Sequence, residues 1–415
     1  MKLTQKIVFK RFLFSLIILL FIRMGTLLPV PEIDHWELAA YIKSHSTIKN
    51  FLSTFSASKV FVVGVFSLNI FPYVNATIII QLLTAISPKL AALQKDGDFA
   101  GQRAVNQLTR QITLGLAILQ SSGISIYLNQ ILFNWNFTFA INTVICLTTG
   151  AMIVLWLSEM ITEYGLGNGS SLLIYTNIVS NLPNLIKKTF FANNGNLEFF
   201  SSFSIIVLVA VSLYSIILLQ EGIRKVPLIS AKQLEQRNLR RIADDFLYLP
   251  LRFNQAGVLP IILATSVLVI PTYLINFGLF PIPIQVFTAF EFLKFLYWPA
   301  YFALVIISSS FYSALVLKPK DLAEQLQKMT VVIPGVRSGR PTVFYLRQVI
   351  NRLTFIGSFA LAILTVIPNF LESTFHISGL NGLSTTSLLI LAGVLLDLSR
   401  EITNIYYSNV YNERY

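Results

Sequence analysis

The run Phe137–Leu157, FTFAINTVICLTTGAMIVLWL, decides the fold because it contains no Asp, Glu, Lys or Arg. A helix of about 20 apolar residues crosses the roughly 30 Å hydrocarbon core of a bilayer. The rest of the chain has the same character: 54% of its residues are hydrophobic, 12% are charged, and its mean hydropathy is +0.68. Since soluble domains carry about 25% charged residues, the sequence indicates an integral membrane protein.

Nine further apolar runs flank this one, so we predict an all-α polytopic membrane protein with ten transmembrane helices. The ten predicted spans are Phe12–Val30, Ile70–Leu83, Ile112–Leu132, Phe137–Leu157, Ser170–Ile186, Phe203–Leu219, Gly257–Ile275, Phe295–Leu317, Leu353–Ile367 and Leu383–Leu398. The sequence contains no linker or low-complexity tract between them. We therefore expect one membrane domain over residues 1–415, built from two packed halves, about 1–190 and about 200–415, as in many channels and transporters.

Basic residues are concentrated in two segments between these spans. Glu221–Arg252 and Lys318–Arg352 together hold 14 of the 31 Lys and Arg residues. With the N-terminus inside, the inside segments carry 24 Lys and Arg residues and the outside segments carry 7. Because positive charge collects on the cytoplasmic side, we predict cytoplasmic loops at 221–256 and 318–352, with both termini cytoplasmic or stromal. The net charge of +12 is then mainly a topology signal rather than evidence for nucleic-acid binding.

The inventory of reactive residues argues against an enzyme. The sequence contains no HExxH motif, no GxSxG motif and no pair of intramembrane aspartates. Its single cysteine, Cys146, excludes an intramolecular disulfide and a multi-cysteine metal site. The glycine-rich run Gly165–Gly169 lacks the GxGxxG pattern and a Walker lysine, so we interpret it as a tight turn between two helices. We expect no catalysis, no cofactor and no metal.

An ion-coupled secondary transporter of a small solute is the alternative function that ten spans allow. Such carriers bury ionisable residues at mid-membrane. Here Arg23, Glu159, Asp397 and Arg400 all lie near the ends of predicted spans, and Asp397 and Arg400 are spaced to pair on one helical face. The apolar interior better suits a pore that closes with an apolar constriction.

A short apolar piece precedes the second span. Val60–Phe66, interrupted by Gly64, is too short to cross a bilayer. Non-helical backbone at membrane depth is tolerated only inside protein or against a water-filled cavity. The segment is therefore either a re-entrant or amphipathic surface segment, or a stopper packed inside a cavity. Pro72 then suits the start of the next helix, where its missing N–H costs nothing.

Five collinear motifs resemble those of the SecY family, the channel-forming subunits of bacterial and plastid protein translocases. They are FPYVNATIIIQLL at Phe71–Leu83, TEYGLGNGSS at Thr162–Ser171, LPLRFNQAGVLP at Leu249–Pro260, KPK at Lys318–Lys320 with IPGVRSG at Ile333–Gly339, and RLT at Arg352–Thr354. The resemblance implies two pseudo-symmetric halves that open around an hourglass pore, with a short plug helix. The implied function is the translocation of unfolded preproteins and the lateral release of signal or transmembrane helices into lipid.

The resemblance also assigns site residues. The pore ring is expected at Ile70, Val74, Ile174, Ile262 and Ile390, and the plug at roughly Thr54–Phe66, including Ser58, Val62 and Gly64. The lateral gate, a side exit between the second and seventh spans, would carry Gln81 and Asn254 as polar residues. Aliphatic side chains suit the ring because they deform around any chain yet offer water and ions no hydrogen bonds at rest, so the pore seals by dewetting.

Partners are likewise implied by the resemblance. Arg224, Lys225 and Arg337 are expected to dock the ribosome and the SecA motor ATPase, while most neighbouring charges only set topology. Arg337 lies in a Pro-Gly-x-Arg-x-Gly turn that suits bidentate contact with carboxylate or phosphate. Further expected partners are small SecE-like and SecG-like membrane subunits, signal-bearing preproteins and lipid. The Ile, Phe, Asn and Leu bias favours a plastid thylakoid membrane over a bacterial plasma membrane.

Overall fold

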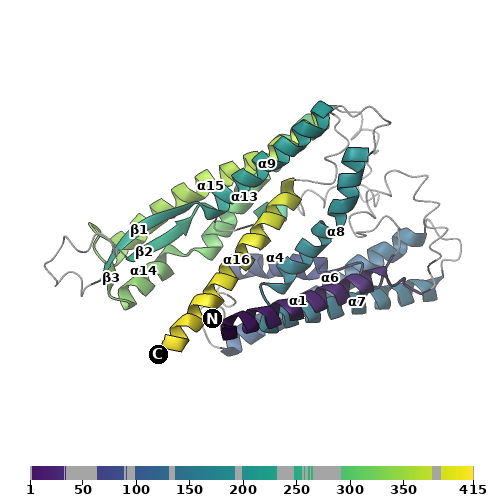
Figure 1. Cartoon of the computed structure of the whole chain (residues 1–415), viewed down its shortest axis with the longest axis horizontal. Coiled ribbons are helices and arrows are strands. Elements are labelled where there is room, and N and C mark those ends of the chain that lie inside the picture. The colour runs from purple at the N-terminus through teal and green to yellow at the C-terminus, as the bar shows by residue number, and fades with distance from the viewer. Residues whose placement is uncertain are drawn as a thin grey trace. The chain divides into compact units, whose positions relative to one another are not determined.

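The computed structural model describes residues 2–31, 33, 63–87, 90, 99–129, 136–191, 199–230, 247–254, 257, 260, 261, 263, 264, 291–375 and 385–414. Its helices are α1 (Lys2–Leu27), α4 (Phe71–Ile86), α6 (Phe99–Asn129), α7 (Phe137–Tyr164), α8 (Gly169–Phe191), α9 (Phe199–Glu221), α13 (Glu291–Val316), α14 (Pro319–Lys328), α15 (Arg340–Phe375) and α16 (Thr385–Arg414). Its strands are β1 (Ile223–Ser230), β2 (Leu247–Arg252) and β3 (Val331–Val332) (Figure 1). Every predicted span except the seventh overlaps one of these helices; the seventh falls largely outside the described residues.

The chain forms two compact units. The first comprises Met1–Asn184 and Val394–Tyr415, and the second comprises Leu185–Gly393. In the first unit, α6 packs against both α4 and α7, and α7 also packs against α1. The fully buried members of its core include Leu68, Ala117, Leu128 and Leu147.

Small and hydroxyl-bearing side chains line the packed face between α6 and α7. Ser121 Oγ on α6 lies 3.1 Å from Thr148 Oγ1 on α7, and Ser121 is fully buried. Close helix approach and hydrogen bonds across helices are the usual means of packing where lipid removes the hydrophobic drive between helices. The Ser121–Thr148 contact therefore serves the association of α6 with α7.

The second unit is organised around α15, which packs against α9, α13 and α14. The core between its apolar helices includes the fully buried residues Ala264, Val305, Leu361 and Ala362. A hydroxyl pair ties α13 to α15, since Ser313 Oγ and Thr354 Oγ1 are 2.6 Å apart.

The all-α prediction is wrong for the two basic loops, because they fold into a small mixed subdomain within the second unit. β1 pairs antiparallel with β2 and with β3, giving the strand order β2-β1-β3. The first loop supplies β1 and β2, and the second supplies α14 and β3. This loop subdomain, defined as Ile223–Arg252 with Lys318–Leu353 over their described residues, encloses Val226, Leu228, Leu251, Leu326 and Leu346. Side chains alternate along β1, with Val226 and Leu228 buried and Lys225 and Pro227 exposed.

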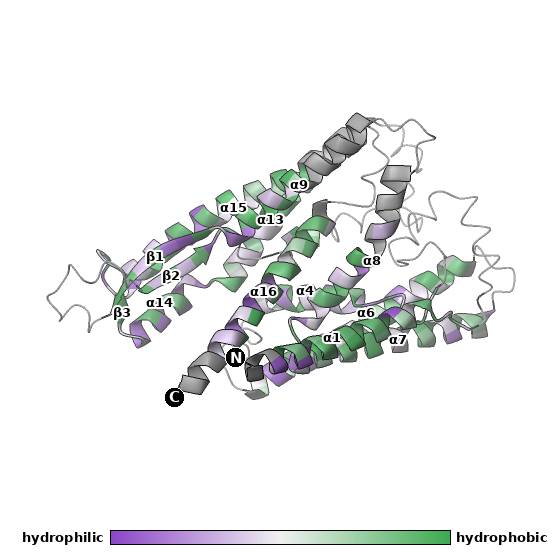
Figure 2. Cartoon of the chain, viewed as in Figure 1, coloured by the Kyte–Doolittle hydropathy of each residue, from purple (hydrophilic) through white to green (hydrophobic). Residues whose placement is uncertain are grey.

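Hydropathy separates the membrane helices from this subdomain. In Figure 2, α1 and α7 are largely apolar and α14 is largely hydrophilic. Three described helical stretches are long and apolar enough to cross a membrane, Phe137–Tyr164, Pro299–Lys328 and Arg340–Val366, and two shorter apolar helices are Phe71–Thr84 and Ala210–Glu221. Large apolar side chains on outer faces, such as Leu119, Ile145 and Trp156, suit contact with lipid rather than water.

Candidate channel site

Two predicted ring residues lie at the start of α4. Ile70 is the residue before the helix, Pro72 follows in its first turn, and the Val74 N–H donates to the Ile70 carbonyl at 3.1 Å. The predicted helix start at Pro72 is therefore confirmed. Ile70 is 1% exposed and Val74 is 7% exposed. Residues four apart share one helical face, so these two aliphatic side chains stand one above the other.

The remaining ring residues come from other elements. Ile174 lies on α8 in the first unit, and Ile390 lies on α16 within the second unit; both are half-buried. Ile262 lies outside the described residues. The closure of these positions into one ring stays a prediction.

The turn that places α8 is Gly165–Asn168, as the glycine-rich motif predicts. Gly167 has φ +79°, a left-handed conformation that glycine adopts without a steric penalty. The first N–H groups of α8 are capped, because Thr162 Oγ1 accepts from the Gly169 N–H at 2.9 Å and Asn168 Oδ1 accepts from the Ser170 N–H at 3.1 Å. The interpretation as a tight helix-to-helix turn is confirmed.

Only the last part of the predicted plug falls on described residues. Gly64 forms an antiparallel bridge with Pro29, and Phe66 lies in the turn that leads to α4. Phe66 is 6% exposed and its ring centroid is 6.4 Å from that of Phe21 on α1. Thr54, Ser58 and Val62 lie outside the described residues. This end of the predicted plug is thus a bridged turn packed on α1 rather than a helix.

Both predicted gate residues carry a buried oxygen without a hydrogen-bond donor among the described residues. Gln81 Oε1 on α4 is one such atom, and Asn254 Oδ1 is the other. Asn254 is 7% exposed, and its Nδ2 donates to the Gly257 carbonyl at 2.9 Å. An unpaired buried acceptor costs about 1–3 kcal/mol. Each residue therefore offers an acceptor that an incoming donor would stabilise.

The predicted docking residues lie on the loop subdomain. Arg224 and Lys225 are exposed neighbours on β1, and the Lys225 Nζ lies 4.9 Å from the ring centroid of Tyr248 on β2, in reach of a cation–π interaction. Arg337 is exposed at a loop tip. Its carbonyl accepts from Thr342 Oγ1 at 2.8 Å, and Gly335 and Gly339 flank it with positive φ. The loop backbone is fixed while the guanidinium faces outward.

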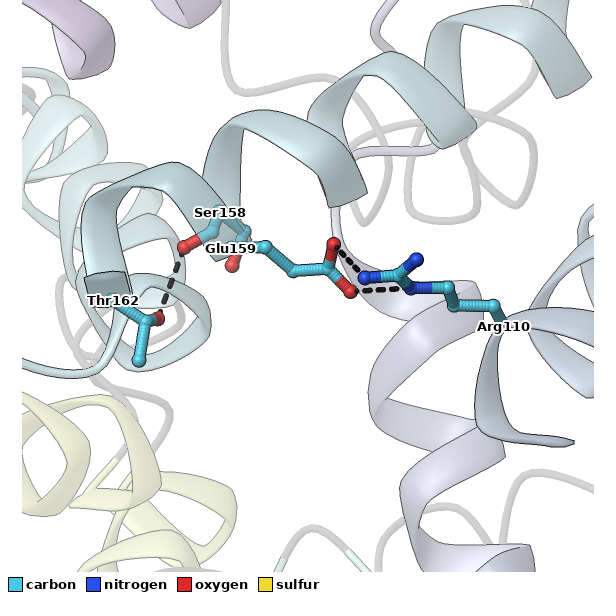
Figure 3. Close-up of polar contacts among 4 residues, drawn as sticks. All are labelled: Arg110, Ser158, Glu159 and Thr162. Atoms are coloured by element: carbon cyan, nitrogen blue, oxygen red, sulfur yellow. Dashed lines mark hydrogen bonds and ion pairs between the residues drawn. The ribbon is translucent and has the colours of Figure 1, made fainter. Parts of the chain in front are cut away.

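Two ion pairs are found on the described parts of the membrane helices. Asp397 and Arg400 are 3.5 Å apart on α16, which confirms the predicted pair. The sequence prediction missed the pair between Arg110 on α6 and Glu159 on α7 (Figure 3). Opposite charges near the same predicted membrane boundary of two consecutive spans were the signal that could have revealed it.

Contacts between glycine and neighbouring backbone were also missed. Gly64 approaches the backbone of Thr26, and Gly150 on α7 approaches the backbone of Val65. The sequence shows where each glycine lies, but it does not show which segment of backbone packs against that glycine.

These elements define a polytopic helical membrane protein with the fold of the protein-conducting channels. A solved SecY structure, described as one whose plug domain stabilises the closed state of the translocation channel, matches with a TM-score of 0.66 and 16% identity over 97% of this chain and 93% of that one. A second, titled as the structure of a protein conducting channel, matches with a TM-score of 0.65 and 17% identity over the same shares.

Sequence comparison then gives the family. The SecY family model matches residues 64–399. The protein translocase subunit SecY of Trieres chinensis is 52% identical over 98% of this chain and 97% of its own length, and that of Porphyra purpurea is 42% identical over 97% of each. The chain belongs to the SecY family, and it is a protein-conducting channel. The comparisons give no support to the secondary transporter.

Proposed function

We propose that Ile70, Val74, Ile174, Ile262 and Ile390 form the constriction through which this channel passes unfolded preproteins. The observation that carries this assignment is the burial of Ile70 and Val74 on one face at the start of α4. An aliphatic ring of this kind closes by dewetting and reopens around a polypeptide of any sequence.

The predicted gate residues suit lateral release. A signal sequence is an apolar helix whose transfer into lipid is favourable, so a side exit needs no covalent chemistry. The unpaired acceptors Gln81 Oε1 and Asn254 Oδ1 would be satisfied by donors of an incoming chain. The position proposed for this gate, between α4 and the predicted seventh span, is the one that the family resemblance implies.

Energy and assembly would come from partners. We propose that the exposed cations Arg224, Lys225 and Arg337 dock the SecA motor and the ribosome, and that SecE-like and SecG-like subunits complete the complex. One fold relative is Sec61 in a canine ribosome–channel complex, with a TM-score of 0.62. Relatives from Porphyra purpurea and Synechocystis support a thylakoid location, and the excess of Lys and Arg in the predicted inside segments supports stromal termini.

Site-specific crosslinking tests the pore. Photoreactive probes at Val74 and Ile262 are expected to capture a stalled nascent chain carrying a functional signal sequence. A probe at Ile145, which is 57% exposed on the outer face of α7, is the control and should yield no adduct with the translocating chain. Absence of adducts at both Val74 and Ile262 would remove the pore assignment.

A further inference from the structure

We propose that Gly64 and Gly150 are positioning residues that fix a root segment, defined as Val63–Asn69, so that this segment stays in place when the channel opens. The inference rests on the proposed ring and plug, and it changes the plug boundary, since Gly64 and Phe66 become part of the stationary structure. The root segment then holds Ile70 and Val74 in place at rest and during opening.

A backbone ladder joins the root segment to the chain that leaves α1. The Val30 N–H donates to the Val63 carbonyl at 3.0 Å, and the Val65 N–H donates to the Leu28 carbonyl at 2.9 Å. Between these two bonds Pro29 lies opposite Gly64, a position that requires no N–H from the proline. Moving the root segment would break both bonds inside an apolar region, where unpaired backbone groups are costly.

Two glycines allow main chain to meet main chain around this ladder. A Cβ at Gly64 would overlap the Thr26 carbonyl oxygen, and a Cβ at Gly150 would overlap the Val65 carbonyl oxygen. Because Gly64 has no Cβ, the root segment lies directly against the end of α1, and because Gly150 has none, the root segment also lies directly against the middle of α7. Backbone oxygens cannot turn aside as a flexible side chain can, so any side chain at either position must displace the root segment.

The side chains of the root segment are built into the core of the first unit. Leu68 is fully buried and Val63 is 6% exposed, and both belong to the core cluster that holds Ala117 and Leu147. Interiors packed at this density transmit displacement rather than absorb it. A root segment that left this cluster would open a cavity between α6 and α7.

The root segment ends on the predicted ring. Asn69 has φ +49° and is buried, and its Oδ1 accepts from the Ile70 N–H at 2.8 Å. The Asn69 N–H in turn donates to the Phe66 carbonyl at 3.0 Å. This turn fixes the direction in which α4 begins, so a displaced root segment would displace Ile70 and Val74.

A disulfide lock tests whether the root segment is stationary. Val30→Cys and Val63→Cys place thiols on directly opposed positions of the ladder, in a Cys146→Ala background within the whole translocase reconstituted in vesicles. We expect the oxidised variant to translocate a preprotein at the rate of its reduced form. Loss of translocation on oxidation that returns on reduction would overturn the proposal.

Glycine substitution tests the positioning role separately. Gly150→Ala is expected to raise resting ion leak through the reconstituted channel several-fold, while preprotein translocation continues. The matched control is Gly115→Ala on α6, because a Cβ at Gly115 meets no atom within 4 Å, and it should leave the leak unchanged. Equal leak in the two variants would contradict the proposal. The nascent-chain crosslinks at Val74 and Ile262 test the pore assignment itself. A wrong pore assignment can therefore be distinguished from a wrong assignment of the stationary root segment.

Discussion

Arg110 on α6 and Glu159 on α7 form a two-pronged ion pair, in which Nε donates to Oε1 at 2.9 Å and Nη2 donates to Oε2 at 2.8 Å (Figure 3). The Arg110 side chain is 54% exposed and that of Glu159 is 30% exposed. Parallel N–H···O bonds fix the relative rotation of the two helices as well as their separation. The pair therefore sets how α6 meets α7 close to the α7–α8 turn.

Breaking this ion pair should lower the stability of the protein only slightly, but the effects of the two single substitutions should not be additive. We expect Arg110→Gln and Glu159→Gln each to lower the free energy of unfolding by about 1 kcal/mol, as for exposed ion pairs. The double variant should lose less than the sum, because the second substitution removes a charge that the first left unpaired. Thermal unfolding of the detergent-solubilised protein measures all three. Strict additivity would mean that the pair contributes nothing in solution.

Ser15 links α1 to the α7–α8 turn, and its removal should be more costly. Its buried Oγ accepts from the Leu166 N–H at 2.9 Å, and Leu166 is 2% exposed. Ser15→Ala leaves that N–H unpaired, so we expect a loss of about 1–3 kcal/mol in the free energy of unfolding. Ser122→Ala is the control, because the Ser122 hydroxyl donates to the Leu119 carbonyl in its own helix. Equal losses in the two variants would contradict a tertiary role for Ser15.

The helical part of the fold can be predicted from the sequence, because the hydrocarbon core of a bilayer offers the backbone no hydrogen-bond partners. Uncharged runs such as Phe137–Leu157 become helices since every backbone group must be satisfied within its own segment. The start of α4 at Pro72 and the turn at Gly167 were equally predictable, because both depend on local backbone preference.

The loop subdomain was not predicted, because its apolar alternation is short and is interrupted by many charged residues. Ile223–Ser230 reads IRKVPLIS, in which Val226 and Leu228 alternate with Lys225 and Pro227, a strand pattern. Its second partner, β3, lies about a hundred positions further along the chain. Pairing over such a separation depends on tertiary contacts that no local pattern specifies.

The sequence predicts which residues belong to the candidate site, but it does not predict which neighbours those residues contact. Family resemblance gives Gly64 a place in the plug, while its approach to Thr26 and its bridge with Pro29 indicate that it is held. Likewise Arg110 and Glu159 are visible in the sequence as isolated charges, and their bidentate geometry depends on how α6 rotates against α7.

The core of the loop subdomain offers a sharp contrast between two nearby residues. Leu346 is fully buried in it, whereas Phe344, two positions earlier on α15, is 70% exposed. We expect Leu346→Ala to destabilise the subdomain by about 2–5 kcal/mol and Phe344→Ala to change its stability hardly at all. Hydrogen exchange of β1 and β2 amides reports the difference. Unchanged protection in the Leu346 variant would show that the strands do not depend on this core.

Charge reversal at Arg337 tests whether the basic loops do more than set topology. The Arg337 backbone is held by the Thr342 hydroxyl, and its side chain is exposed, so Arg337→Glu should leave the fold and the membrane insertion of the protein intact. We expect translocation to fall sharply, since a partner that presents carboxylates or phosphates would meet a like charge.

Lys328→Glu supplies the matched control for that reversal. Lys328 is an exposed cation at the end of α14, in the same loop, and its replacement changes the net charge by the same amount. If the loops act only through their total charge, the two variants should lose translocation and orientation alike. If Arg337 is a docking contact, only the Arg337 variant should lose translocation, and the loss should appear as weaker binding of motor or ribosome to vesicles that hold a correctly oriented channel. Normal translocation by the Arg337 variant would leave its guanidinium with a topological role alone.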